Sequence, residues 1–210
     1  MSAFNKNFSN GFASNECLGV VLAGGLSSRM GQDKATLRRN STDMLNISKQ
    51  LLLNSGIKNV VVSGDKYDIP DKVKESGPVG GIYSVLSRFP QAKSLLILPV
   101  DLPFMTAKTL ADLRIKGELS QKATYFEGHS IPLFLPNDAY IEVFLSKVFS
   151  HSLIENIKDP SKKAKGKQGP SIKMLLQNTP HQAIQCTDSR VLFNTNTPEQ
   201  WQQAMNQFDF

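Results

Sequence analysis

The chain carries the stretch LAGGLSSRMGQDKA at residues 22–35, directly after a short apolar run at residues 17–21. An apolar strand that stops at paired glycines and then supplies hydroxyl groups and two cations is suited to holding a polyphosphate. Glycine lets the backbone approach phosphate closely, while backbone N–H groups, Arg29 and Lys34 supply the counter-charge. We therefore expect this loop to bind an anion.

The glycine spacing excludes two common phosphate-binding motifs. A P-loop requires G-x-x-x-x-G-K-[ST], and a dinucleotide-binding fold requires G-x-G-x-x-G. Neither pattern occurs in the chain, because Gly24, Gly25 and Gly31 do not fit the spacing of either. The alternative, a glycine-rich turn that only joins a strand to a helix, stays open at this point.

Length and composition are those of one ordinary globular domain, with 210 residues, 40% hydrophobic and 20% charged. We expect residues 1–16 to form a flexible tail and residues 17–210 a single domain. No stretch has the apolar length of a membrane span, and the first residues lack the apolar centre of a secretory signal. Cys17 and Cys186 have neither a disulfide framework nor a metal spacing, so we expect buried thiols and a cytoplasmic location.

The net charge of +6 favours anionic partners but does not choose among nucleic acid, a nucleoside triphosphate and a phosphorylated small molecule. The sharpest basic cluster, Lys158 to Lys173, is either a solvated loop or a binding site for a phosphate. Nucleic acid is disfavoured, because the basic residues are not interleaved with stacking aromatic side chains.

The apolar pattern predicts alternating strands and helices. Continuous apolar runs predict strands at 17–21, 59–63 and 94–100, separated by helices at 43–55 and 77–89, and this order favours a parallel sheet. Ser41 and Thr42 are candidate caps of the helix at 43–55. Further helices are expected at 106–116, 138–150, 171–177 and 198–207, and extended segments at 123–126, 131–135, 182–187 and 191–193. The pattern predicts an α/β fold, a three-layer α/β/α sandwich that is mainly parallel with an antiparallel addition in its second half.

Asp101 follows the predicted strand at 94–100, within the segment PVDLP. In open parallel sheets, ligands gather at the carboxyl ends of the strands, so Asp101 and the loop at 22–35 are expected to face one crevice. Mg²⁺ prefers one or two carboxylates together with substrate phosphate oxygens. The alternative is that Asp101 caps the helix predicted to begin at Thr106. Asp101 lies several residues too early in the sequence for that role.

The stretch 22–35 resembles the signature loop of nucleotidyltransferases that activate small molecules, and most closely that of the molybdenum cofactor guanylyltransferases, whose pattern reads L-A-G-G-x-S-x-R-M-G-x-D-K-A. The resemblance continues at GPVGG (77–81), at PVDLP and at NTNTPEQW (194–201). It implies a Rossmann-like fold of the nucleotide-diphospho-sugar transferase type. It also implies transfer of GMP from Mg·GTP to the terminal phosphate of molybdopterin, with release of pyrophosphate.

The resemblance implies catalytic roles for Arg29, Lys34 and Asp101, with Asp101 on Mg²⁺. Asp71 is expected to face guanine, with Asp65 and Asp68 as nearby competitors. The residues expected to bind nucleotide or metal are Leu22, Ala23, Gly24, Gly25, Lys34, Ser63, Asp71, Gly80, Asp101, Asn194 and Asn196. The two asparagines have an alternative role, in which they only shape the turn before the helix at 198–207.

Three positions depart from the family pattern. Asp43 lies where members commonly carry Lys-Pro-Leu, and Ser63 replaces an asparagine. The His-Pro pair of the family is interrupted, because two residues separate His129 from the next proline. A cytidylyltransferase or another nucleotidyltransferase of this fold, and a non-catalytic nucleotide- or cofactor-binding homologue, therefore remain alternatives. The partners implied are GTP and molybdopterin, with cofactor-insertion or molybdoenzyme maturation proteins as further candidates, but neither nucleic acid nor a membrane.

Overall fold

The computed structural model describes residues 16–24, 34–39, 41–158 and 169–208, apart from the side chains of residues 151–158. Several predicted features lie outside the described residues, namely the tail up to residue 15, Gly25, Gly31 and Arg29 of the signature loop, and residues 159–168 of the basic run. Glu16, the last residue of the predicted tail, accepts a hydrogen bond from the Lys93 N–H through its carbonyl at 3.1 Å.

Six strands form one sheet, in which five strands share a direction and one is reversed. Their order is β4 (Asn59–Ser63), β1 (Cys17–Leu22), β5 (Ser94–Pro99), β7 (Leu133–Pro136), β6 (Ala123–Phe126) and β8 (His181–Ile184). The central strand β1 is parallel to both neighbours, and Val20 pairs with Val61 of β4 and Ile97 of β5. Strand β7 is antiparallel to β5 and to β6. The predicted mainly parallel sheet with an antiparallel addition is confirmed.

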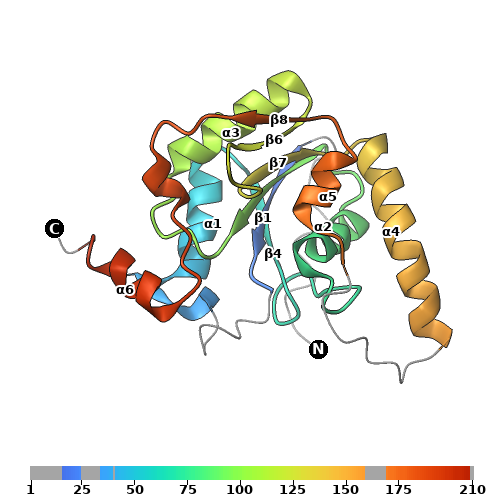
Figure 1. Ribbon diagram of the computed structural model, residues 1–210, viewed down its shortest axis with the longest axis horizontal. Coiled ribbons are helices and arrows are strands. Elements are labelled where there is room, and N and C mark those ends of the chain that lie inside the picture. The colour runs from blue at the N-terminus through green and yellow to red at the C-terminus, as the bar shows by residue number, and fades with distance from the viewer. Residues whose placement is uncertain (1–15, 25–33, 40, 159–168, 209–210) are drawn as a thin grey trace.

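Helices cover both faces of the sheet, which confirms the three-layer α/β/α sandwich (Figure 1). One face carries α2 (Gly77–Arg88), α4 (Ala139–Lys158) and α5 (Ile172–Gln177), and the other carries α1 (Met44–Asn54) and α3 (Ala107–Ser120). Successive residues of a strand point to opposite faces. Val20 therefore packs in the core under α2, while Val21 packs in the second core, which includes Leu110 and Leu113 of α3.

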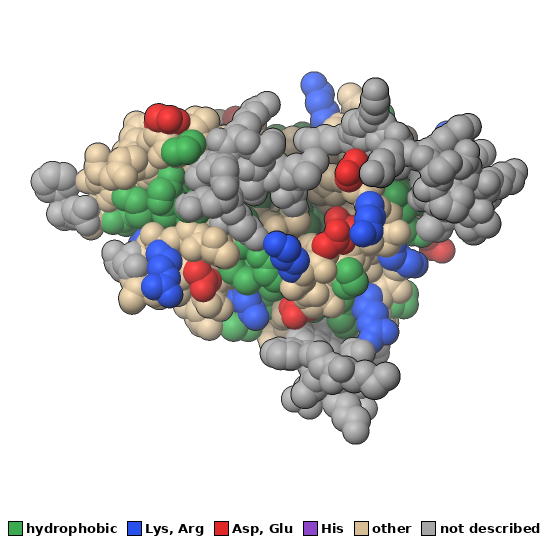
Figure 2. Space-filling model, turned by 90° about the horizontal axis from the view of Figure 1, so that it is seen from below, with side chains coloured by type: hydrophobic (Ala, Val, Ile, Leu, Met, Phe, Trp, Pro, Cys, Tyr) green, Lys and Arg blue, Asp and Glu red, His purple; other side chains and the backbone are tan. Residues whose placement is uncertain are grey.

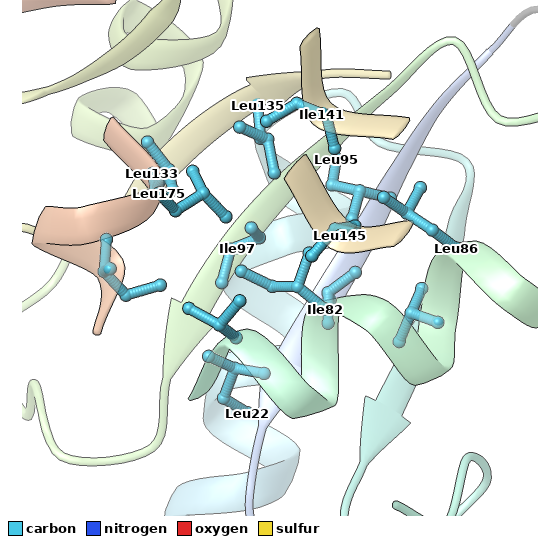
Figure 3. Close-up of a cluster of buried hydrophobic side chains, with 14 of the residues drawn as sticks. Leu22, Ile82, Leu86, Leu95, Ile97, Leu133, Leu135, Ile141, Leu145 and Leu175 are labelled. Atoms are coloured by element: carbon cyan, nitrogen blue, oxygen red, sulfur yellow. The ribbon is translucent and has the colours of Figure 1, made fainter. Parts of the chain in front are cut away.

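The core under α2, α4 and α5 shows how the sheet is held (Figure 3). Leu95 and Ile97 of β5 are fully buried there, and so is Leu133 of β7. They pack against apolar side chains of the covering helices, including Ile82, Leu86, Ile141, Leu145 and Leu175. Each such burial stabilises the fold by about 1.5 to 3 kcal/mol. The strands are therefore firmly held, and so are the positions at which they end.

The start of α1 differs from the prediction. Asp43, rather than Ser41 or Thr42, caps this helix, because its carboxylate accepts the Asn46 N–H at 2.7 Å. Thr42 instead belongs to the short strand β3 (Thr42–Asp43), which pairs with β2 (Arg38–Arg39). This small hairpin was not predicted. Asp43 therefore has a structural role, because it both pairs with Arg38 in the hairpin and caps α1.

Other boundaries were only partly predicted. Helices α3 and α4 run to Ser120 and Lys158, further than the expected ends at 116 and 150. Residues 191–193 are not the extended segment that we expected, because the 3-10 helix η3 (Ser189–Leu192) occupies most of this stretch. The Asp188 side chain accepts the Arg190 N–H at 3.0 Å, and this local cap favours the turn.

The two cysteines are free and half-buried. Burial raises the pKa of the Cys17 thiol to about 11. The Cys186 thiol donates to the carbonyl of Asp188 at 3.2 Å. In the part of the chain that the structure describes, no helix has the length and apolarity to span a membrane.

Candidate active site

The site lies where β1, β4 and β5 end, and we call this side of the sheet the carboxyl edge. The N–H groups of Ala23 and Gly24 both donate to the carbonyl of Ser63, at 3.0 and 3.1 Å, so the loops that leave β1 and β4 are tied together. A side chain at Gly24 would place its Cβ 3.2 Å from the Cα of Gly64. The Gly24 N–H, which we expected to contact phosphate, is thus already engaged with Ser63.

Figure 2 views the carboxyl edge, where Lys or Arg and Asp or Glu side chains both appear. Among the described side chains, this face shows a mixture of signs rather than a continuous basic surface.

Three segments that are distant in sequence meet at Lys34, in the 3-10 helix η2 (Lys34–Thr36). The Lys34 Nζ lies 3.0 Å from Oδ2 of Asp101, directly after β5, and donates to Oδ1 of Asn196 at 2.8 Å. The side chains of Lys34 and Asp101 are each only 16% exposed. The structure therefore brings together three of the predicted residues, from three of the four regions that carry the resemblance to the guanylyltransferases.

The segment that carries Asn194 and Asn196 is fixed to the backbone of Asp101. Thr195 is fully buried, and its N–H and hydroxyl donate to the Asp101 carbonyl at 3.0 and 3.3 Å. Thr197 caps α6 (Pro198–Met205) and forms a reciprocal capping box with Gln200. Because Thr197 and Gln200 already cap the N-terminus of α6, the side chains of the two asparagines are not needed for that role.

In the two segments that Thr195 joins, two buried oxygens have no hydrogen-bond partner among the residues that the structure describes, Oδ1 of Asp101 and Oδ1 of Asn194. Buried polar atoms are normally satisfied, so unpaired acceptors indicate a missing donor or cation. A carboxylate and an amide oxygen are ligands that Mg²⁺ accepts, provided that substrate oxygens and waters complete its shell. In the described ranges, no group of three or more His, Cys, Asp or Glu side chains is placed to hold a metal. The residues fit a metal that arrives with a phosphate.

The loop between β4 and α2 separates the three candidate carboxylates for the base. Asp68 accepts the Val62 N–H at 2.9 Å, and Asp65 accepts the Asp71 N–H at 3.3 Å, so both support the loop itself. Asp71 points toward Gly24, since its Oδ2 would lie 3.7 Å from a Cβ placed there. Burial, and secondly the charge of Asp65, raise the pKa of the Asp71 carboxyl. No described residue donates a hydrogen bond to the Asp71 carboxylate, which leaves it free to accept from a ligand.

Ser63 and Gly80 serve packing between the sheet and α2. Ser63 is buried, and a Cβ at Gly81 would lie 2.8 Å from its hydroxyl oxygen. A Cβ at Gly80 would overlap the side chain of Ser76, whose hydroxyl donates to the carbonyl of Val73. The nucleotide contacts that we assigned to Ser63 and Gly80 stay predictions, because this packing already accounts for the residue types.

No motif in the sequence indicates the cluster of side chains around Arg39. Its guanidinium donates to the carbonyl of Pro103 at 2.9 Å and lies 3.9 Å from the ring centroid of Phe208. The ring of Phe104 lies 4.7 Å from that of Phe208. Arg39 therefore connects the β2–β3 hairpin and the C-terminal segment to the loop that carries Asp101.

The C-terminal helix α6 lies near the start of α1 (Figure 1). Trp201 of α6 packs there in a small core with Leu37 and Met44. His129, by contrast, is exposed in the turn after β6, where its N–H donates to the Phe126 carbonyl at 2.9 Å.

Comparison with known proteins identifies similar sequences and folds. A family model described as the MobA-like NTP transferase domain matches residues 19–159. The chain is 33% identical over 193 residues to the molybdenum cofactor guanylyltransferase of Xanthomonas euvesicatoria pv. vesicatoria, covering 90% of this chain and 94% of that protein. It is 28% identical over 187 residues to a probable molybdenum cofactor guanylyltransferase of Flavobacterium johnsoniae, covering 84% of this chain and 88% of that protein.

Among solved structures, the molybdopterin-guanine dinucleotide biosynthesis protein A of Archaeoglobus fulgidus has a TM-score of 0.65 and 17% identity, covering 91% of this chain and 98% of that chain. The shared fold confirms the nucleotide-diphospho-sugar transferase type.

Proposed function

The chain belongs to the family of MobA-like NTP transferase domains and is a nucleotidyltransferase, and we propose that it transfers GMP from Mg·GTP to the terminal phosphate of molybdopterin. The observation that carries this proposal is the meeting of Lys34, Asp101 and Asn196 at the carboxyl edge. The guanylyl group and the pterin acceptor are proposed from the names of the relatives. We further propose that the reaction takes place in the cytoplasm and that cofactor-insertion or molybdoenzyme maturation proteins receive the product.

In the proposed reaction, a phosphate oxygen of the acceptor attacks the α-phosphorus of GTP. A new P–O bond forms, the bond between the α-phosphorus and the bridging oxygen breaks, and pyrophosphate leaves with that electron pair. The attacking phosphate is already an anion, so no side chain has to remove a proton. The protein therefore acts by aligning the two phosphates and by neutralising their charge.

We divide this work between the phosphate and metal part of the site and the base part. Lys34, together with Arg29, binds the triphosphate and stabilises the leaving pyrophosphate. Asp101 and Asn194 hold Mg²⁺, which when bound supplies positive charge to the phosphate oxygens. In the base part, the Asp71 carboxylate accepts from the ring N–H and the exocyclic amine of guanine, a pair of donors that cytosine lacks.

The departure at Asp43 does not weaken this assignment. Its two carboxylate oxygens accept from the backbone and the side chain of Asn46, at 2.7 and 3.0 Å. The acid is therefore occupied at the start of α1 instead of adding negative charge to the phosphate site.

The test is an assay of pyrophosphate release by the purified protein, with each of the four nucleoside triphosphates, Mg²⁺, and molybdopterin present or omitted. We expect release only with GTP, Mg²⁺ and molybdopterin together. A faster reaction with CTP would replace the guanylyl assignment with a cytidylyl one. Release that never depends on molybdopterin would refute the proposed acceptor.

A further inference from the structure

Lys34 contacts Asp101, the carboxylate that we assign to Mg²⁺, and Asn196 beside it. Its ammonium lies 3.0 Å from Asp101 Oδ2 and 2.8 Å from Asn196 Oδ1. An ammonium and a divalent cation both seek such oxygens. Asp101 carries a single negative charge, so Lys34 neutralises it fully before any other cation arrives.

The backbone of Asp101 and Asn196 is held in place, whereas the ammonium of Lys34 lies at the end of a flexible side chain. The Asp101 carbonyl is fixed by two hydrogen bonds from Thr195, and the Asn196 N–H donates to Gln200 Oε1 at 2.7 Å. Lysine carries its charge at the end of a flexible four-carbon stem with three rotatable donors. A change of ion partner here requires rotation of one side chain and no movement of the sheet.

We propose that Lys34 is an internal competitor of the metal, holding Asp101 and Asn196 until a triphosphate offers its ammonium a stronger anionic partner. This inference rests on the proposed function, which places Mg²⁺ and the triphosphate at this edge. Its consequence is that the cation and the nucleotide bind as one unit. A bare cation must share Asp101 with Lys34, while a cation that arrives with a triphosphate finds the carboxylate released.

The coupling can be measured from either ligand. If the nucleotide raises the affinity of the protein for the metal, the metal raises the affinity for the nucleotide by the same factor. Lys34 accounts for part of this coupling. Removing its charge should therefore raise the affinity for a bare cation while lowering the rate of transfer, two effects of opposite sign.

The experiment uses Mn²⁺, which takes similar oxygen ligands, and follows the free ion by electron paramagnetic resonance in the presence and absence of GTP. The variants are Lys34→Ala and Lys34→Gln, the second of which keeps a hydrogen-bond donor without the charge. Lys58→Ala is the matched control, because it removes the same charge from an exposed pair with Glu16. Circular dichroism of each full-length variant verifies the fold.

We expect Lys34→Ala to bind Mn²⁺ without nucleotide at least tenfold more tightly than the parent and Lys58→Ala, a change of about 1.4 kcal/mol. The gain in Mn²⁺ affinity on adding GTP should shrink by at least tenfold, and adding Asp101→Asn should abolish the tighter binding. Bare Mn²⁺ affinity in both Lys34 variants equal to that of Lys58→Ala would overturn the competition, although GTP-dependent Mn²⁺ binding by the parent would still support the proposed function. A parent that binds no Mn²⁺ even with GTP would refute the metal assignment, and the competition with it.

Discussion

Replacing Asp71 by alanine removes a half-buried carboxylate of the β4–α2 loop for which the described residues supply no hydrogen-bond donor. The side chain is half-buried and points toward Gly24, so it lies beside the loop that is proposed to hold the phosphates. If it accepts two hydrogen bonds from guanine, each bond to a charged acceptor is worth about 1.5 to 3 kcal/mol. Because Asp71 stays partly exposed, water hydrogen bonds compensate for part of the free energy that the guanine contacts contribute. The low end of that range therefore applies to each bond.

Two such bonds give about 3 kcal/mol, which corresponds to about a hundredfold in relative affinity. We therefore expect Asp71→Ala to narrow the preference for GTP over CTP, measured as the ratio of kcat/KM values, by about tenfold to a hundredfold. The Mg²⁺ dependence should not change, since Asp101 and Lys34 keep their contacts.

The assay is acceptor-dependent pyrophosphate release at several concentrations of GTP and CTP. Asp68→Ala is the matched control, because it removes the same charge from the same loop but takes a hydrogen-bond acceptor away from the Val62 N–H rather than from the ligand side. It should lower stability and leave base preference unchanged. An unaltered ratio in Asp71→Ala, or an equal fall in both variants, would refute the assignment of Asp71 to guanine.

Three further predictions follow from described contacts. Asp101→Asn should lower turnover on the order of a hundredfold or more, because it removes the charge of a metal ligand while leaving Lys34 an acceptor; near-normal turnover with an unchanged circular dichroism spectrum would remove Asp101 from the reaction. Burial and Asp65 raise the pKa of Asp71, so its contribution to stability is full below the unfolded pKa and is lost as pH rises through the folded pKa. Asp71→Asn should therefore stabilise the protein more at pH 7 than at pH 4 in urea unfolding, and an equal effect at both would contradict this cause. Gly80→Ala should lower the free energy of unfolding by about 1 to 3 kcal/mol, and Ser76→Gly should restore it; a stable variant with a raised KM for GTP would show instead that Gly80 faces the nucleotide.

The parts of the site that could be predicted from the sequence are those whose signal is local. A continuous apolar run that ends in a polar residue marks both a buried strand and the edge at which it stops, and this was enough to place Asp101 and the loop after β1 on one side of the sheet. The pairing of Lys34 with Asn196 joins residues 162 positions apart, and nothing near either residue indicates it. The same holds for Arg39 and Phe208.

The cap of α1 illustrates a second limit. Ser41, Thr42 and Asp43 are consecutive residues whose side chains are all able to cap a helix. The choice among them depends on the β2–β3 hairpin, in which Arg38 pairs with Asp43 and thereby fixes where the helix begins. A two-residue strand has too little periodicity to be recognised from the sequence.

The attachment of Thr195 to the Asp101 carbonyl has a consequence for the order in which the protein becomes competent during synthesis. All the described strands of the sheet are complete by residue 184, so the layered core has its whole sequence before Asn194 leaves the ribosome. Lys34 and Asp101 are already present at that stage, but Asn196, which accepts from Lys34, and Thr195, which donates to the Asp101 carbonyl, are not. A nascent chain can therefore assemble its scaffold first, and the phosphate-handling side chains take their final positions only when the segment from 194 to 205 closes over them.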